Sequence, residues 1–317
     1  MNNRIGLMLS ARPDMKYSSQ ILRSPLVLGA RMNTGAPVTG SKVSAVRGFR
    51  HMLEPKQAWI DLKCRELRLV ETATIPGDRL ELNHSISVRT PTAVYYNDGA
   101  GVLVVDRVEE GRFLVIRPPK MQTEGGSLTL GKGASLNIPD NTLHVDGFLT
   151  ESDIEYIEAC VEADLHNYLL SFVESRADLK QLRDLDPLAN VILKVESKRG
   201  LRFVAEDFDP VRDRATLLLA RGDLFVELDY VHQILGAARD LIARDPNAIA
   251  ASRLLLSFMR EDSMPSCADV FDVGYLLEIG YRQFLLGDEV CTDETTLSSV
   301  IGFFSALEKD YFSARKA

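Results

Sequence analysis

Three charged side chains in the second half of the sequence stand where buried strands would end. Lys194 and Glu196 lie two residues apart in VILKVESKRG, so both side chains leave the same face of an apolar strand. Asp223 follows the next apolar run, in LLLARGDLFVEL. Charges on a buried face need partners, and an internal salt bridge without any ligand is one explanation. The other is a site in which Glu196 and Asp223 hold Mg²⁺ or Mn²⁺ beside the ammonium group of Lys194.

The residues around Asp223 could also hold an anion. Gly222 lets backbone amides approach a bound group closely, and Asp223 opens a segment whose first N–H groups are free to bind a carboxylate. The letters RGD also spell an adhesion triplet. At the end of a buried strand in this chain, we interpret that match as a coincidence.

The elements that position these residues alternate between strand and helix. An apolar face with helical spacing follows Glu227 and includes Val231, Leu235 and Leu241. Successive strands in the second half start roughly 20 to 35 residues apart, as expected of βα units. The eight expected strands are residues 5–9, 26–32, 58–62, 167–171, 190–195, 216–220, 248–251 and 283–286. Eight such strands predict an α/β fold, a closed (β/α)8 TIM barrel.

A stretch from about Leu69 to Val145 breaks this rhythm with short alternating runs and turn signals such as Pro76-Gly77 and Asn97-Asp98-Gly99. We predict that residues 69–145 form a small all-β lid domain inserted into a barrel made of residues 1–68 and 146–317. An insertion at the C-terminal end of a barrel strand lies beside the usual active-site mouth.

Composition narrows the class of protein. The chain has 317 residues and a formal net charge of -8, and its pI is about 5.3. This balance argues against nucleic acid or an anionic membrane as a partner, and no apolar run approaches the ~20 residues of a membrane span. The four cysteines show no paired spacing and the five histidines no ligand spacing, so we expect reduced thiols and a cytoplasmic protein.

Motifs along nearly the whole chain resemble those of pyruvate kinases. KVESKRG resembles the family's KIENxxG, and LLLARGDLFVEL resembles MVARGDLGVE. In the same order as in the family, VLGARMNTG is similar to RLNFSHG, WIDLKCRELRL to DLKGPEIR, MPSCADVFDV to PTRAEVSDV, and FLLGDEVC to MLSGETA. One such match would be weak evidence, whereas a set in one order is specific.

The resemblance implies roles for matching residues. Lys194, Arg31 and Ser252 match catalytic positions, and Glu196 and Asp223 match the Mg²⁺ or Mn²⁺ ligands. The implied substrate-binding set is Ala220, Gly222, Asp223 and Ser252. Asn33 and Asp61 match residues around a monovalent cation, and the matches on the nucleotide side are Lys63, Arg68, Asp98 and Glu289.

Several positions depart from the family pattern. Thr34-Gly35 replaces the serine and histidine of FSHG, and Leu62 replaces a threonine, so a dependence on K⁺ is doubtful. Arg253 replaces a glutamine, and Gly287-Asp288 replaces Ser-Gly before Glu289. The family's residues are therefore retained more fully at the carboxylate and metal positions of the implied site than at its nucleotide positions.

The resemblance implies a glycolytic, Mg²⁺-dependent phosphotransferase acting on phosphoenolpyruvate or pyruvate, with ADP or ATP as the second substrate. Two alternatives remain open. One is a Mg²⁺-dependent 2-oxo-acid aldolase or lyase that uses the same enolate site, and the other is a binding protein without catalysis. The chain ends at Ala317, so we expect the C-terminal allosteric domain of the family to be absent and a homodimer, rather than a tetramer, to be possible.

Overall fold

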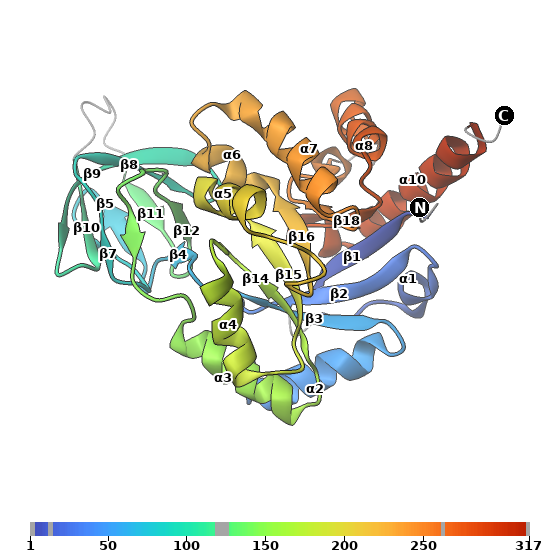
Figure 1. The fold of residues 1–317 in the computed structure, drawn as a ribbon, viewed down its shortest axis with the longest axis horizontal. Coiled ribbons are helices and arrows are strands. Elements are labelled where there is room, and N and C mark those ends of the chain that lie inside the picture. Colours follow the sequence, from blue (N-terminus) through green and yellow to red (C-terminus); the bar gives the residue numbers. More distant parts are fainter. Residues whose placement is uncertain (1–3, 12–14, 118–126, 261–263, 315–317) are drawn as a thin grey trace.

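The computed structural model describes residues 4–11, 15–117, 127–260 and 264–314. Eight parallel strands close a barrel in the order β1-β18-β17-β16-β15-β14-β3-β2 (Figure 1). They are β1 (Gly6–Ala11), β2 (Val27–Asn33), β3 (Gln57–Leu62), β14 (Asn167–Leu170), β15 (Asn190–Val195), β16 (Ala215–Ala220), β17 (Ile249–Ala251) and β18 (Gln283–Leu285). Each predicted barrel strand has its counterpart here, because apolar runs of this length suit parallel strands that are covered on both faces.

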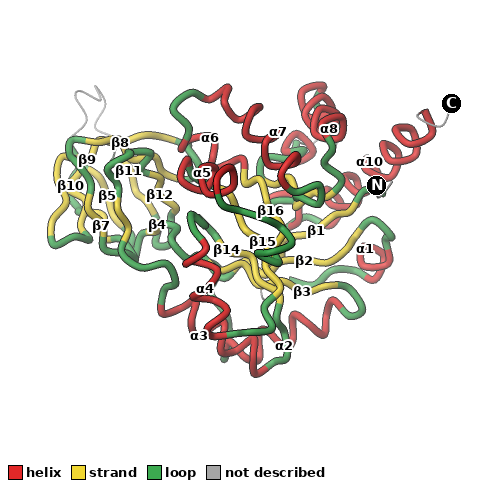
Figure 2. The backbone as a smooth tube through the Cα atoms, viewed as in Figure 1, coloured by secondary structure: helices red, strands yellow, loops and turns green. Residues whose placement is uncertain are grey.

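Helices surround the barrel, as Figure 2 shows in red. They are α1 (Ser19–Arg23), α2 (Lys42–Leu53), α3 (Glu151–Glu162), α4 (Arg176–Leu185), α5 (Lys198–Glu206), α6 (Arg221–Glu227), α7 (Ile234–Arg244), α8 (Cys267–Ile279), α9 (Asp288–Cys291) and α10 (Glu294–Ala314), with short 3-10 turns η1 (Val231–Gln233) and η2 (Leu256–Met259). The apolar face predicted after Glu227 is correct only for its second half. Leu241 is buried in α7, whereas Val231 and Leu235 are 54% and 50% exposed.

A smaller β domain is inserted between β3 and α3 and lies at the left in Figure 1. Its six-stranded sheet has the order β4-β12-β8-β9-β10-β6, and two short pairs, β11-β5 and β13-β7, complete it. The strands are β4 (Leu67–Arg68), β5 (Ala73–Ile75), β6 (Leu80–Glu81), β7 (Ile86–Ser87), β8 (Thr92–Tyr96), β9 (Gly101–Glu109), β10 (Phe113–Ile116), β11 (Leu128–Leu130), β12 (Ser135–Asn137) and β13 (His144–Val145). Because β4 pairs with β12, the small sheet begins at Leu67, two residues before the boundary that we predicted.

Three separate apolar cores hold this architecture. The largest lies between the barrel strands and the surrounding helices and includes Leu7, Ile60 and Phe284. A second fills the barrel interior, where Leu218 and Ile249 pack together. The third belongs to the small domain alone. The barrel and the small domain therefore each bury their own apolar surface. Contacts between the two can be made by polar side chains, because neither needs the other to cover its apolar core.

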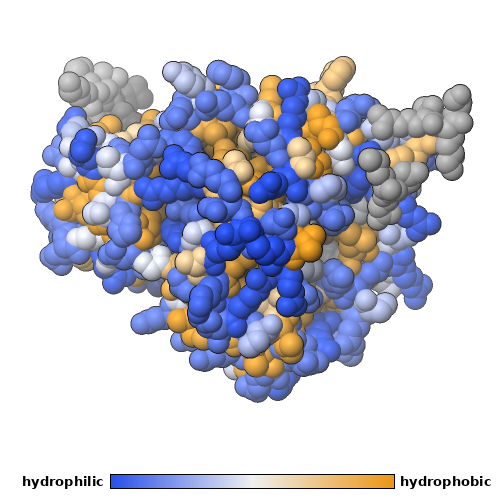
Figure 3. All heavy atoms as spheres, in the orientation of Figure 1, coloured by the Kyte–Doolittle hydropathy of each residue, from blue (hydrophilic) through white to orange (hydrophobic). Residues whose placement is uncertain are grey.

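The face shown in Figure 3 is mostly hydrophilic, with hydrophobic residues in small groups. In the described part of the chain, no helix combines the length and hydropathy of a membrane span.

Candidate active site

The predicted site residues meet at one cavity of about 380 Å³, at the C-terminal ends of the barrel strands. This is the end of a (β/α)8 barrel at which catalytic groups are found. The predicted residues that line it are Arg31, Asn33, Lys63, Arg68, Asp98, Lys194, Glu196, Ala220, Asp223, Ser252 and Glu289. The other two, Asp61 and Gly222, lie directly behind the lining. Asp61 contacts Arg31, and a Cβ at Gly222 would lie 3.4 Å from the Cβ of Ser252.

Lys194 stands among oxygen atoms near the end of β15. Its ammonium nitrogen lies 2.9 Å from Oε1 of Glu196 and 3.5 Å from Oδ1 of Asp61, and it donates a hydrogen bond of 2.8 Å to Oγ of Ser171. Although burial alone would lower the pKa of Lys194, the charges of Asp61 and Glu196 raise it well above its ordinary value. Lys194 is therefore a fixed cation and not a general base.

Asp61, at the end of β3, is fully buried and surrounded by cations. Arg31 bonds to it directly, and the nitrogen of Lys63 lies 3.4 Å from its Oδ2. Burial would raise the pKa of this carboxyl, but the positive charges of Lys194, Lys63 and Arg31 hold the pKa well below its usual range. Asp61 therefore fixes the orientation of three basic side chains at the cavity wall.

Glu196 and Asp223 bring two carboxylates to this cavity. Glu196 is buried, and its Oε2 accepts a hydrogen bond of 2.7 Å from the backbone N–H of Phe172. Asp223 is partly buried, and desolvation together with the charge of Glu196 raises its pKa well above the ordinary value. Two carboxylates that oppose each other's ionisation in one cavity fit Mg²⁺ or Mn²⁺. The described residues contain no group of three or more His, Cys, Asp or Glu side chains that could hold a metal ion.

The residues predicted for a monovalent cation do not fit one. Asp61 already faces three protein cations. The side-chain oxygen of Asn33 accepts a hydrogen bond from the backbone N–H of Gly35, and its amide nitrogen donates to Asp288. A Cβ at Gly35 would lie 3.1 Å from Cε of Lys63. The space beside Gly35 is therefore filled by Lys63, and we derive no role for K⁺.

The ends of β16 and β17 form the opposite wall. Ala220 precedes α6, so the amides of Gly222 and Asp223 belong to the first turn of that helix, where N–H groups lack helical partners. Ser252 follows β17 in a left-handed conformation, with φ +66°. Arg221 is not among the residues that line the cavity; it pairs with Asp272 at 2.6 Å and donates to the carbonyl oxygen of Ser252. Its contacts are structural, and they hold the backbone that presents Ser252.

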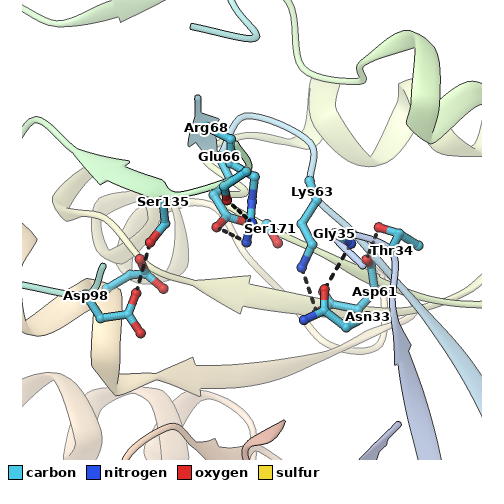
Figure 4. A network of polar contacts seen from close by, with 12 residues as sticks. Asn33, Thr34, Gly35, Asp61, Lys63, Glu66, Arg68, Asp98, Ser135 and Ser171 are labelled. Carbon is cyan, nitrogen blue, oxygen red and sulfur yellow. Dashed lines mark hydrogen bonds and ion pairs between the residues drawn. The ribbon is translucent and has the colours of Figure 1, made fainter. Parts of the chain in front are cut away.

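The small domain closes one side of the cavity. Arg68 of β4 pairs with Glu66 at 2.7 Å, and Ser135 donates to Asp98 at 3.4 Å. These four residues line the same cavity as Lys63 and Asn33, and Figure 4 shows their side chains from close by.

The structure also brings to the site several residues that had no predicted role. Glu66, Arg253 and Asp288 line the cavity. Asn137 of the small domain donates a hydrogen bond of 3.2 Å to Oδ1 of Asp223. Ser171 directly follows β14, so the rule that polar residues at strand ends line the barrel mouth could have identified it. Asn137 comes from the inserted sheet, to which this rule about strand ends does not apply.

These features define an α/β-barrel protein with a basic and carboxylate-lined site at the barrel mouth, partly closed by an inserted β domain. The family described as "Pyruvate kinase, barrel domain" matches residues 73–293. The chain belongs to the pyruvate kinase family.

Similar proteins agree with this assignment. The chain is 25% identical over 264 residues to the pyruvate kinase of Methanocaldococcus jannaschii, a match that covers 76% of this chain and 55% of that protein. It is 27% identical over 277 residues to the pyruvate kinase of Thermococcus litoralis, covering 86% of this chain and 54% of that protein. The chain thus spans about half the length of these curated relatives.

Proposed function

We propose that this chain is a Mg²⁺-dependent phosphotransferase that moves a phosphoryl group between phosphoenolpyruvate and a nucleotide, as pyruvate kinases do. The observation that carries the proposal is the meeting of Lys194, Glu196 and Asp223 at one barrel-mouth cavity. A phosphoryl transfer needs positioning and charge neutralisation more than covalent chemistry, and this cavity offers both.

Each residue would have a distinct task. Glu196 and Asp223 would hold the divalent cation, which when bound supplies positive charge to the phosphoryl and enol oxygens. Lys194, kept charged by Asp61 and Glu196, neutralises the phosphoryl group during transfer. Arg31 orients that group. The first-turn amides of Gly222 and Asp223 and the hydroxyl of Ser252 hold the substrate carboxylate.

The transfer breaks the bond between phosphorus and the enol oxygen. The electron pair stays on that oxygen, the phosphoryl group passes to the terminal phosphate of ADP, and protonation at the methylene carbon gives pyruvate. The nucleotide would lie on the side of Lys63, Arg68, Asp98 and Glu289, which line the same cavity. We further propose that the protein acts on these small molecules in the cytoplasm as part of glycolysis, and that it can assemble as a homodimer.

One observation favours a second candidate, the 2-oxo-acid aldolase or lyase. Arg31, the proposed phosphoryl ligand, already contacts two carboxylates, Asp61 and Asp288. An aldolase or lyase would keep the metal and carboxylate half of the site and would need no phosphoryl position.

The test is pyruvate formation from phosphoenolpyruvate, ADP and Mg²⁺, followed by coupling to lactate dehydrogenase. We expect turnover that EDTA abolishes. A lack of pyruvate combined with Mg²⁺-dependent exchange of the methyl protons of pyruvate would contradict the phosphotransferase and support the second candidate.

A further inference from the structure

Asp288 brings a negative charge to the part of the cavity where the phosphoryl group is proposed to bind. It is the first residue of α9, directly after the Gly287 that follows β18. Its Oδ2 accepts a hydrogen bond of 2.7 Å from Nδ2 of Asn33 and lies 3.6 Å from Nη2 of Arg31. Two polar side chains at the end of β2 thus turn toward one carboxylate from the end of β18.

The positive charge of Arg31 is consequently shared between two acids. Asp61 bonds its Nη1, Asp288 lies beside its Nη2, and its Nε donates to Oγ of Ser10 at 2.9 Å. Two of the three guanidinium nitrogens therefore donate hydrogen bonds to groups of the protein itself, and the third lies within ion-pair distance of Asp288. A ligand anion that approaches Arg31 must take over part of this coordination.

We propose that Asp288 is a specificity-determining residue, whose carboxylate competes with the phosphoryl group of the substrate for Arg31 and Asn33. The inference rests on the proposed function only in its assignment of Arg31 to the phosphoryl group. Asp61 is fully enclosed and cannot leave Arg31 without losing its other cations, whereas the side chain of Asp288 is 36% exposed and can turn toward solvent.

This competition favours one class of ligand. A bare phosphate would meet the Asp288 charge at short range in a partly buried cavity, where repulsion between like charges is poorly screened. A phosphorylated substrate that is anchored elsewhere by its carboxylate can displace Asp288 with binding energy from that second group. The site would thereby discriminate against inorganic phosphate, which lacks a second anchor.

The experiment measures the binding of inorganic phosphate by isothermal titration at low ionic strength, with the unmodified chain, Asp288→Asn and Glu289→Gln. Asparagine has nearly the shape of aspartate but no charge. Glu289 is the control, because it lines the same cavity and carries the same charge as Asp288. Among the described residues, the ion-pair partners of Arg31 are Asp61 and Asp288, and not Glu289. We expect Asp288→Asn to tighten phosphate binding about tenfold, which corresponds to about 1.4 kcal/mol, and Glu289→Gln to change it by less than about threefold.

The double variant Arg31→Gln, Asp288→Asn tests whether the gain in phosphate affinity requires Arg31. If Asp288 acts by competing for Arg31, the gain disappears in this background, because the contested cation is gone. Thermal unfolding checks the fold of each variant, and Asp288→Ser, which also removes the charge, replaces Asp288→Asn should the latter fail to fold.

Three results would overturn the proposal. Equal tightening by Asp288→Asn and Glu289→Gln would mean that only the total charge of the cavity matters. An unchanged or weaker affinity in Asp288→Asn would mean that the carboxylate does not compete. A gain in phosphate affinity that remains in the double variant would show that Asp288 does not compete for Arg31. Phosphate binding needs no turnover, so these results are independent of whether the chain forms pyruvate.

Discussion

Among single residues, Lys194 has the most closely defined surroundings. It is held between Glu196, Asp61 and Ser171, and its charge is fixed by the two carboxylates. A fixed ammonium group in a partly enclosed cavity stabilises developing negative charge without having to reorganise during the reaction. Replacing Lys194 should therefore lower the rate of turnover with little effect on the binding of the substrate.

Replacing Lys194 with methionine should lower kcat by about 10²- to 10³-fold, the range found when one preorganised electrostatic group is removed. KM for phosphoenolpyruvate should change much less, because the carboxylate cradle remains. The matched control is Lys198→Met. Lys198 lies four residues further along the chain, at the start of α5, lines a different hollow and pairs with Asp229 at 2.7 Å. Equal losses in both variants would show that charge in general, and not Lys194, supports turnover.

Glu227 gives stability a pH dependence. It is 7% exposed, and burial raises its pKa from 4.5 to about 7. A carboxyl with a raised folded pKa stabilises the fold below its unfolded pKa, and this contribution is lost as pH rises from about 4.5 to about 7.

Urea unfolding of Glu227→Gln and the unmodified chain between pH 4.5 and pH 8 checks this assignment. Glutamine keeps the shape without titrating, so the variant should gain stability relative to the unmodified chain with rising pH. The difference should reach on the order of 3 kcal/mol at most above pH 7. A difference that stays constant with pH would mean that Glu227 titrates normally in the folded protein.

At the scale of elements, the pairing of β2 with β3 brings Arg31 and Asn33, which lie on β2, close to Asp61, which lies on β3. Gly29 pairs with Gln57 at the start of this contact. A Cβ at Gly29 would lie 2.1 Å from the backbone oxygen of Gln57, and backbone cannot move aside as a flexible side chain can. Glycine is thus required for the register that aligns the two strand ends.

Gly29→Ala should therefore destabilise the protein by about 1–3 kcal/mol, as overpacking of a filled interior does. Gly48→Ala is the control, because Gly48 lies on the exposed face of α2 with open space around it. That variant should gain roughly 0.5–1 kcal/mol from the higher helix propensity of alanine. Chemical denaturation measures both, and a neutral Gly29→Ala would contradict the tight strand contact.

At the scale of the whole molecule, the cavity belongs to two bodies with separate cores. The barrel supplies Lys194, Arg31 and the two proposed metal ligands. Asn137 of the small domain bonds Asp223, and the backbone oxygen of Asp98 accepts a hydrogen bond from Arg253. These polar contacts reach across from the small domain to the barrel wall. Movement of the small domain would therefore alter the surroundings of Asp223 directly.

The barrel was predictable because its strands are buried on both faces, as in the run LLLA that ends at Ala220. The grouping of Lys194, Glu196 and Asp223 followed from strand order, since neighbouring parallel strands present their C-terminal ends at one mouth. The contacts of Asp288 and Asn137 could not be predicted in this way. They depend on where a short helix and an inserted sheet meet the cavity, and long-range packing, not local sequence pattern, determines both.

The most direct test of the central claim is a crystal structure of the chain with Mn²⁺ and oxalate, in which the ion is located by its anomalous scattering. Oxalate resembles the enolate of pyruvate. One of its carboxylates takes the place of the pyruvate carboxylate, and an oxygen of the other takes the place of the enolate oxygen. We expect Mn²⁺ bound by Glu196 and Asp223, with oxalate against the first turn of α6 and within reach of Lys194. Mn²⁺ or oxalate bound elsewhere, with no ion beside Glu196, would contradict the proposed site.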